Sequence, residues 1–280
     1  NEQKRLSELE NVKRHAAEKI FREQMIREIR QGSRVALIAN INIPNYSTPI
    51  TVVCVHLENR TIPKNRKKQM EYLLEKIYNI KNPVILAGDF NSTCSDGSPT
   101  GVRKEISKKL KDPHFIAKSV IMYGMPHVFL INSVLATTNF ARKYTDPTVK
   151  SIPIISPNKE RGLFKLLEKY EFADDYTFDF RGTKDKSSNG KKGNLANSNE
   201  RTSFGFVPTF IFERPLMIGK YKLDWFFIKA FTDDPYDKDD SYVLAPHNAR
   251  SLIDLNYAFD KPLADHVPIT VDLPLNEPSK

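Results

Sequence analysis

Two polar side chains, Asp89 and Asn91, follow an apolar stretch at residues 84–87 and have types suited to chemistry. The stretch is typical of a buried β-strand, and side chains two positions apart on a strand point the same way. Asp89 offers a hard oxygen ligand for a divalent cation, and Asn91 offers an amide that can hold water or a phosphate oxygen. The structural alternative is an Asx turn that closes the strand, and these residues alone leave both interpretations open.

Three further segments carry isolated polar residues beside apolar runs. His56 follows four apolar residues, Asp224 interrupts an aromatic run, and Asp265 and His266 precede a run rich in β-branched residues. Each alone has a plain explanation: a structural histidine, a carboxylate that holds a backbone amide, or a turn. Together they supply carboxylates and imidazoles without a serine or cysteine nucleophile, a mixture that suits metal-assisted hydrolysis of a phosphate ester.

The elements that would position these side chains follow from the hydrophobic pattern. Residues 34–43 and 50–57 are β-rich and flank a turn-forming cluster, which predicts a hairpin whose second strand carries His56 near its end. We expect a helix over residues 66–80, followed by the strand that ends at Asp89. This order predicts a crossover unit in a mixed sheet.

The second half of the chain has a weaker pattern. We expect a helix over residues 160–170 and a flexible basic loop over residues 181–203, which has little to bury. Strands resume after this loop and are nearly continuously apolar, which favours sheets covered on both faces. The expected strands are residues 207–212, 221–229, 241–245 and 267–273.

The pattern predicts an amphipathic helical lead-in over residues 1–33, one α/β domain over residues 34–274 and a tail over residues 275–280. In the lead-in, apolar residues recur at helical spacing among Lys, Arg and Glu, so structural packing is its simplest explanation. The chain opens on Asn1 rather than Met, and we therefore expect a fragment or a processed product.

Composition limits the choice of partners and compartments. The chain has 280 residues and a formal net charge of +9, which favours a polyanionic or phosphate-bearing partner. Cys54 and Cys94 have neither metal-ligand nor redox spacing, and the position of Cys54 in an apolar run predicts a buried free thiol. No apolar run approaches the ~20 residues that span a bilayer. An exposed apolar hairpin of the kind that docks lipases is not evident either.

Four motifs, taken in order, resemble the endonuclease/exonuclease/phosphatase family. They are V-H-L-E-N, A-G-D-F-N-S, K-L-D-W-F-F and A-D-H-V-P-I. The family includes pancreatic-type deoxyribonucleases, abasic-site endonucleases, neutral sphingomyelinases and inositol-polyphosphate phosphatases. The resemblance covers about residues 34–273 and implies a DNase I-like, four-layer α/β sandwich, with two mixed β-sheets packed face to face and helices outside.

The resemblance also implies a role for each strand-end residue. His266 matches the catalytic histidine, acting as general base on water or as partner of the scissile phosphate. Asp224 matches the carboxylate that orients His266, and Asp265 matches a metal ligand, bound directly or through water. The implied cofactor is Mg²⁺ or Mn²⁺.

The remaining motif residues would contact the phosphate. By the same resemblance, Asp89 and Asn91 position the attacking water and a phosphate oxygen. His56 matches a second histidine that contacts the phosphate and helps the leaving group.

The chain departs from the family pattern at its start. Family members carry an asparagine on their first strand and a metal-binding glutamate on the next, both upstream of the first histidine motif. Here only the charged lead-in precedes residue 34, and Glu23 and Gln24 have the wrong order. We therefore expect that the N-terminal strands of the domain are missing from this sequence. The alternative is a member of the family without catalysis.

The resemblance narrows the substrate, because the motif arginines of inositol-phosphate phosphatases are replaced here by Phe90 and Trp225. Nucleic acid is the predicted substrate. Asn59, Arg60 and Arg66 lie where the family's substrate loop lies, and the two arginines would neutralise backbone phosphates.

The sequence as a whole predicts a divalent-metal-dependent phosphodiesterase, specifically a nuclease. The alternatives are a phosphatase or phospholipid phosphodiesterase of the same fold, or a non-catalytic protein that binds phosphate or nucleic acid. No stable protein partner is inferred, and a monomer is expected. The pattern indicates no compartment, and the long insertion over residues 93–158 has no functional assignment.

Overall fold

The computed structural model describes residues 34–46, 48–59, 61–92, 142, 145–151, 157–214, 217–229, 244–259 and 261–275. The chain divides into two units, residues 1–35 and 36–280, and every helix and strand named below belongs to the second. The predicted lead-in helix and most of the 93–158 insertion lie outside the described residues.

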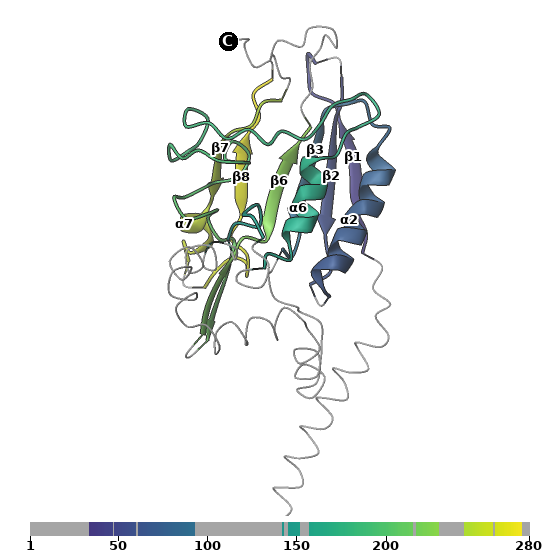
Figure 1. The fold of residues 1–280 in the computed structure, drawn as a ribbon. Coiled ribbons are helices and arrows are strands. Elements are labelled where there is room, and N and C mark those ends of the chain that lie inside the picture. The colour runs from purple at the N-terminus through teal and green to yellow at the C-terminus, as the bar shows by residue number, and fades with distance from the viewer. Residues whose placement is uncertain are drawn as a thin grey trace, which may run out of the picture. The chain divides into compact units, whose positions relative to one another are not determined.

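A mixed sheet with the strand order β1-β2-β3-β6 positions the candidate site (Figure 1). β1 (Leu37–Ile41) is antiparallel to β2 (Ile50–His56), which is parallel to β3 (Val84–Asp89). β3 is in turn antiparallel to β6 (Asp224–Ile228). The helix α2 (Pro63–Ile77) joins β2 to β3. The predicted hairpin and the crossover unit in a mixed sheet are therefore confirmed.

Two helices lie over the same face of this sheet (Figure 1). α2 begins at Pro63, three residues before the predicted start, because the fixed φ of proline suits the first turn of a helix. α6 (Arg161–Glu168) falls within the predicted range. Their apolar side chains and those of the sheet form one core, which includes Val53, Val55, Met70, Leu74, Leu86, Phe164, Trp225 and Phe227.

The opposite face of the sheet is more exposed at its β1–β2 side. Along β2, Val53 and Val55 are buried whereas Cys54 is exposed, because neighbouring side chains on a strand alternate between faces. All five residues of β1 are exposed as well. The prediction of a buried Cys54 thiol is therefore wrong, although the cysteine is free as expected.

The remaining strands form two short pairs. β4 (Phe210–Arg214) pairs with β5 (Met217–Tyr221), and β7 (His247–Ser251) pairs with β8 (Ile269–Asp272). The fold is thus mixed α/β with one four-stranded sheet. A second large sheet was expected from the family resemblance. Within the described residues, the strands outside the four-stranded sheet form these two pairs and no second large sheet. The strand expected over residues 241–245 is not found at its described residues, 244 and 245.

The segment over residues 181–203, expected to have little to bury, is buried in its later part. The run from Leu195 to Asn199 is buried, and the Asn199 side chain exchanges two hydrogen bonds with the backbone of Phe226 on the outer edge of β6. The buried Arg201 forms an ion pair with Asp146. A hydrophobic pattern misses such a segment because polar side chains, bonded to backbone groups, hold it in place.

Candidate active site

The site is a row of three side chains across the end of the mixed sheet. The register pairs His56 of β2 with Asp89 of β3, and Asp89 with Asp224 of β6. Paired residues in adjacent strands project from the same face. Three residues from separate parts of the chain therefore meet because hydrogen-bonded strands put them in line. His266 joins them from a bridge between its own backbone and Phe210.

The chain can place Asp89 there because of the glycine before it. Gly88 has a φ of 136°, and a Cβ at this position would lie 2.0 Å from the carbonyl oxygen of Val55. Only glycine adopts this conformation and allows the neighbouring strand to approach so closely. The motif glycine therefore serves backbone geometry, and the chemistry falls to Asp89.

Asn91 fixes the turn that follows. Its φ is 47°, its backbone N–H donates to Asp89 Oδ1 at 2.8 Å, and its side-chain Nδ2 donates to the Leu57 carbonyl at 2.8 Å. This is the Asx turn that the sequence left open. Asp89 can serve both the turn and the site. Its Oδ1 accepts the hydrogen bond of the turn, and its carboxylate still faces the other residues of the cluster. Asn91 is buried and its amide N–H is used internally, so its role as a direct phosphate ligand stays a prediction.

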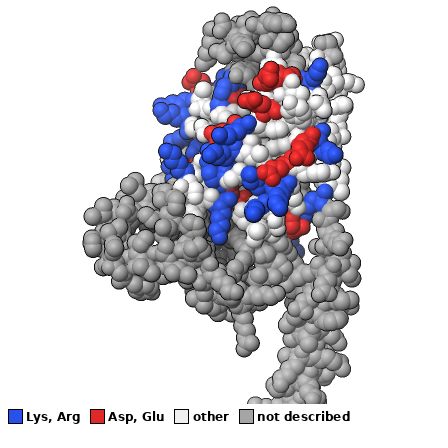
Figure 2. All heavy atoms as spheres, turned by 45° about the vertical axis from the view of Figure 1, so that its right-hand side comes forward, with Lys and Arg blue, Asp and Glu red and all other residues white. Residues whose placement is uncertain are grey.

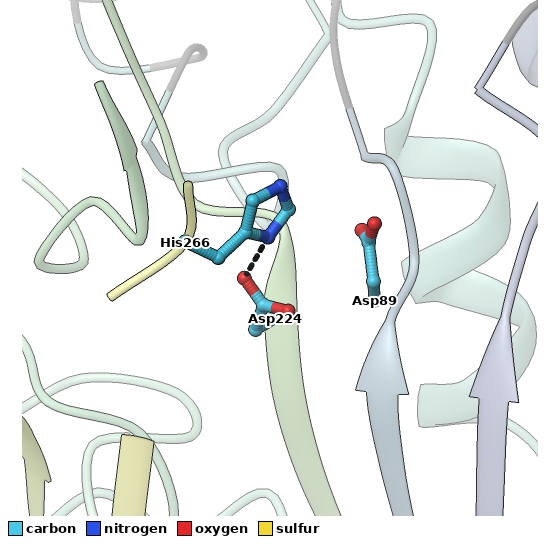
Figure 3. Close-up of side chains that lie close together, drawn as sticks. All are labelled: Asp89, Asp224 and His266. Atoms are coloured by element: carbon cyan, nitrogen blue, oxygen red, sulfur yellow. Dashed lines mark hydrogen bonds and ion pairs between the residues drawn. The ribbon is translucent and has the colours of Figure 1, made fainter. Parts of the chain in front are cut away.

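His266 and Asp224 form the closest pair in the cluster (Figure 3). His266 Nδ1 lies 2.9 Å from Asp224 Oδ2, a contact that places a proton on Nδ1 and leaves Nε2 to face water or substrate. This hydrogen bond raises the pKa of His266 above its ordinary value, against the effect of burial. Burial raises the pKa of Asp224, but hydrogen bonds from His266 and Thr209 outweigh it, and the resulting pKa is lowered.

Asp89 lies across from this pair, as Figure 3 shows. Burial raises the pKa of Asp89, its hydrogen bond from Asn91 opposes the rise, and the negative charge of Asp224 adds to it. His56 Nε2 is 3.3 Å from Asp89 Oδ2, and the His56 side chain is 57% exposed. His56 therefore stands at the solvent side of the row, within reach of a ligand.

The donor set can take a small hard cation. One ligand atom each from Asp89, Asp224 and His266 lie within 4.8 Å of one another. Two carboxylates suit Mg²⁺ or Mn²⁺, and water supplies the remaining ligands of such ions. Two carboxylates this close also repel each other, and a cation between them would relieve that repulsion.

The structure separates Asp265 from this group. Asp265 is exposed and precedes His266, on which its charge acts only as a minor influence. It does not belong to the three-residue cluster. Its role as a metal ligand therefore stays a prediction, while Asp224 takes a place among the candidate ligands.

The predicted substrate loop is organised differently from expectation. Arg66 is fully buried and pairs with the equally buried Glu160, so its guanidinium cannot meet a substrate. Its Nη1 instead donates to the carbonyls of Glu58 and Thr61. The substrate-binding interpretation of Arg66 is therefore corrected to a structural one. Asn59 is exposed as expected, and Arg60 lies outside the described residues.

The exposed charges of α2 and α6 are mixed in sign. Figure 2 shows acidic side chains interleaved with basic ones on the side of the molecule that carries these helices. Lys67 pairs with Glu71, and Arg161 pairs with Glu168. The lysines of α2 therefore do not make a purely basic track, which weakens one basis for predicting nucleic acid.

Two residues that the sequence did not single out border the site. The hydroxyl oxygen of Thr209 accepts the backbone N–H groups of Leu223 and Asp224 and fixes the start of β6. Lys222 is buried, and burial lowers its pKa to about 8 although Asp224 and Glu200 oppose that change. A lysine two residues before an aspartate in an apolar run was the available signal.

The comparisons with known proteins leave the family open. No family model matches the chain, and no curated protein matches it. One solved structure, a functionally unknown conserved protein from Enterococcus faecalis V583, is similar with a TM-score of 0.37 and 13% identity. That match covers 85% of this chain and 56% of the other, so the chain spans little more than half of it. A likeness at this TM-score carries no argument about function.

Proposed function

We propose that this chain is a phosphoester hydrolase of the endonuclease/exonuclease/phosphatase kind, with the four-layer sandwich of that family. The observation that carries the proposal is the meeting of Asp89, Asp224 and His266 at one end of the sheet. Each comes from a separate motif, and the Asp224–His266 hydrogen bond has the geometry of an oriented general base.

In the proposed reaction a water oxygen attacks the phosphorus atom while the ester P–O bond breaks. His266 Nε2 takes the proton from this water, and Asp224 stabilises the imidazolium that forms. Asp89 orients the water from the opposite side of the cluster. His56, at the exposed end of the row, gives a proton to the departing oxygen.

The reaction is proposed to use Mg²⁺ or Mn²⁺. Asp89 and Asp224 would hold the ion, and Asp265 is the further carboxylate that the sequence suggests. The bound ion would neutralise charge on the phosphate and make it a better electrophile. The protein residues would orient the water, hold the proton on Nδ1 of His266 and receive the proton that water loses.

Nucleic acid is the substrate that the sequence favoured, and the charges now argue less strongly for it. Arg66 and Arg201 are buried in ion pairs and do not face a substrate. On the 181–203 segment, Lys184, Lys191 and Lys192 are exposed. These lysines can still contact backbone phosphates, with an affinity that falls steeply with salt. A phosphatase or phospholipid phosphodiesterase of the same fold is the alternative.

The test uses bis(p-nitrophenyl) phosphate, which reports phosphodiester hydrolysis without a choice of natural substrate. Wild-type protein should release nitrophenol with Mg²⁺ or Mn²⁺, and both a chelator and His266→Ala should abolish the release. His247→Ala is the matched control, because His247 lies on β7 outside the cluster and contacts the Ala245 carbonyl. Turnover that survives the chelator would contradict the proposed use of a metal ion. Turnover that survives His266→Ala would contradict the proposed role of His266 as general base.

The non-catalytic alternative makes a different prediction. A phosphate-binding protein without catalysis would retain DNA or RNA at low salt and release it at high salt, with no nitrophenol formed under any metal condition. That result would replace the hydrolase proposal with a binding function.

A further inference from the structure

Two lysine side chains are buried at opposite ends of β6, and they differ in what holds their charge. Lys229 directly follows the strand, at the end away from the site. Its Nζ donates to the carbonyls of Ile80 and Lys81, at 2.7 and 3.3 Å. It also pairs with Asp174 Oδ2 at 2.7 Å. A buried ammonium with three acceptors, one of them a counter-charge, is typical of a structural residue.

Lys222, which lies two residues before β6, is as deeply buried but has no such acceptors. It is 1% exposed, and within the described part of the chain its Nζ forms no hydrogen bond and no ion pair. Its ammonium lies 5.6 Å from the centre of the Trp225 ring, which replaces only part of the hydration that burial removes. A buried charge without acceptors costs stability, so its presence indicates a role other than holding the fold together.

Hydrogen bonds place Lys222 at the end of the sheet that carries the site. Ser92, three residues after Asp89, donates from its hydroxyl to the Lys222 carbonyl at 2.9 Å. The same hydroxyl oxygen accepts the indole N–H of Trp225 at 2.9 Å. The segment that leads into Asp224 is therefore joined to the segment that leaves Asp89, and Lys222 lies behind the cluster formed by these two carboxylates and His266.

Two carboxylates act on the Lys222 ammonium. Burial lowers the pKa of Lys222 to about 8, and the negative charges of Asp224 and Glu200 oppose this decrease, so the group keeps its charge at neutral pH. Glu200 is already engaged, because its Oε2 accepts the Ser251 N–H at 2.6 Å. The interaction with Asp224 is mutual, and the ammonium stabilises the charged form of that carboxylate.

A fixed positive charge at this place changes what the cluster can bind. Asp89 and Asp224 repel each other, and this repulsion favours the entry of a divalent cation between them. A nearby ammonium relieves part of the repulsion and at the same time repels an incoming cation. Part of the positive charge that a phosphate ester meets would then come from the protein itself.

We propose that Lys222 is a resident cation of the candidate site, which lets Asp89 and Asp224 lie close together before an ion binds and weakens the affinity of the cluster for divalent cations. Lys222 is a positioning residue, because its buried ammonium acts through Asp224 rather than on a substrate. The inference rests on the proposed function for the choice of ion, whereas the effect on cation binding follows from the charges. The chain keeps this charge in its core at a cost in stability.

The experiment measures Mn²⁺ affinity and thermal stability of the full chain carrying Lys222→Met. Methionine fills a similar volume without the charge. Mn²⁺ should bind roughly tenfold more tightly or more, as measured by electron paramagnetic resonance of the free ion, because one repelling charge is gone. The melting temperature should not fall, because an apolar group replaces a buried charge without acceptors. Asp89→Asn removes a candidate ligand and should weaken Mn²⁺ binding, which assigns the measured ion to the cluster.

Lys229→Met is the matched control. It removes an equally buried charge that has three acceptors, and it leaves Asp174 without its counter-charge. The melting temperature should therefore fall, whereas the Mn²⁺ affinity of the folded variant should equal that of the wild type, because Lys229 lies at the other end of β6.

Four results would overturn the inference. They are a melting temperature of Lys222→Met as low as that of Lys229→Met, an Mn²⁺ affinity that Lys222→Met leaves unchanged, no Mn²⁺ binding in either the wild type or Lys222→Met, and full Mn²⁺ binding in Asp89→Asn. Turnover of bis(p-nitrophenyl) phosphate by the wild type is measured separately with Mn²⁺ present. Tighter Mn²⁺ binding in Lys222→Met without any wild-type turnover would contradict the proposed function and leave this inference standing.

Discussion

The two segments that flank the site are fixed by opposite chemistry. The turn after His56 is held by charge, because buried Arg66 donates to the carbonyls of Glu58 and Thr61 and is neutralised by Glu160. The loop that begins at α7 (Ile253–Asn256) and ends before His266 is held by the neutral amide of Asn256, which bonds both backbone groups of Ala264. We call it the apolar loop because Ile253, Leu255, Tyr257, Phe259 and Leu263 are exposed on it. One segment buries a pair of charges, and the other exposes large apolar side chains.

This difference indicates what each segment is for. A buried ion pair rarely increases stability over an apolar replacement, but it specifies one arrangement of the groups it bonds. Arg66 therefore fixes the turn beside His56. Half-exposed apolar side chains give little stability to the fold, because water still covers much of their surface. The first segment holds a turn through buried charge, whereas the second keeps its form through a neutral amide and leaves apolar groups in water.

The largest expected effect comes from breaking the buried pair. Glu160→Ala leaves the Arg66 guanidinium without its counter-charge in the core, and we expect a loss of about 3–5 kcal/mol in the free energy of unfolding. Urea denaturation measures it. Glu168→Ala is the control, because Glu168 pairs with Arg161 at the surface of the same helix and should cost less than about 1 kcal/mol. Equal losses in the two variants would show that burial of the pair is unimportant.

A smaller effect is expected from releasing the apolar loop. Asn256→Ala leaves the Ala264 N–H and carbonyl without their partner, which should cost about 1–3 kcal/mol. Urea denaturation measures the loss. Asn194→Ala, at an exposed asparagine, is the control. An Asn256 variant as stable as the wild type would mean that the hydrogen bonds do not organise the loop.

The sequence predicted the row of site residues because strand patterning is local. Four apolar residues before His56 and four before Gly88 identify two strands, and the helix between them makes those strands parallel. Asp89 and His56 then fall at the same end of the sheet without further information. The motif order supplied Asp224 and His266.

The sequence could not predict which charges are buried. Arg66 and Glu160 are 94 residues apart, and a basic residue in a helix start resembles a surface residue until its partner is known. The apolar loop is the opposite case. Its high content of apolar residues around Leu255 and Tyr257 is typical of a buried segment. Only the fold shows that these side chains face water. Long-range pairing and exposure are global properties that local pattern does not encode.

A third prediction concerns catalysis by His266 and His56, which lie next to the two segments. His266 must be neutral to accept a proton, and its pKa is raised by the hydrogen bond to Asp224, so kcat/KM should fall with decreasing pH through a value above 6.5. Asp224→Asn also removes a candidate metal ligand, so the rate should fall, and at saturating Mg²⁺ the acidic limb of the remaining rate should move to lower pH because the charge that favours imidazolium is gone. A pH–rate profile with bis(p-nitrophenyl) phosphate measures the shift. His56→Ala should lower the rate with little movement of that limb.

The smallest expected effect is the most informative about the apolar loop. Phe259→Ser removes a large side chain that is already 65% exposed, so the free energy of unfolding should change by no more than about 0.5 kcal/mol. The same replacement at Phe90, which is fully buried against Phe227, should cost several kcal/mol. Thermal or urea denaturation of both variants supplies the contrast. A Phe259 variant destabilised as much as the Phe90 variant would show that Phe259 packs within the fold. The exposed segment would then join the buried one as a structural element of the site.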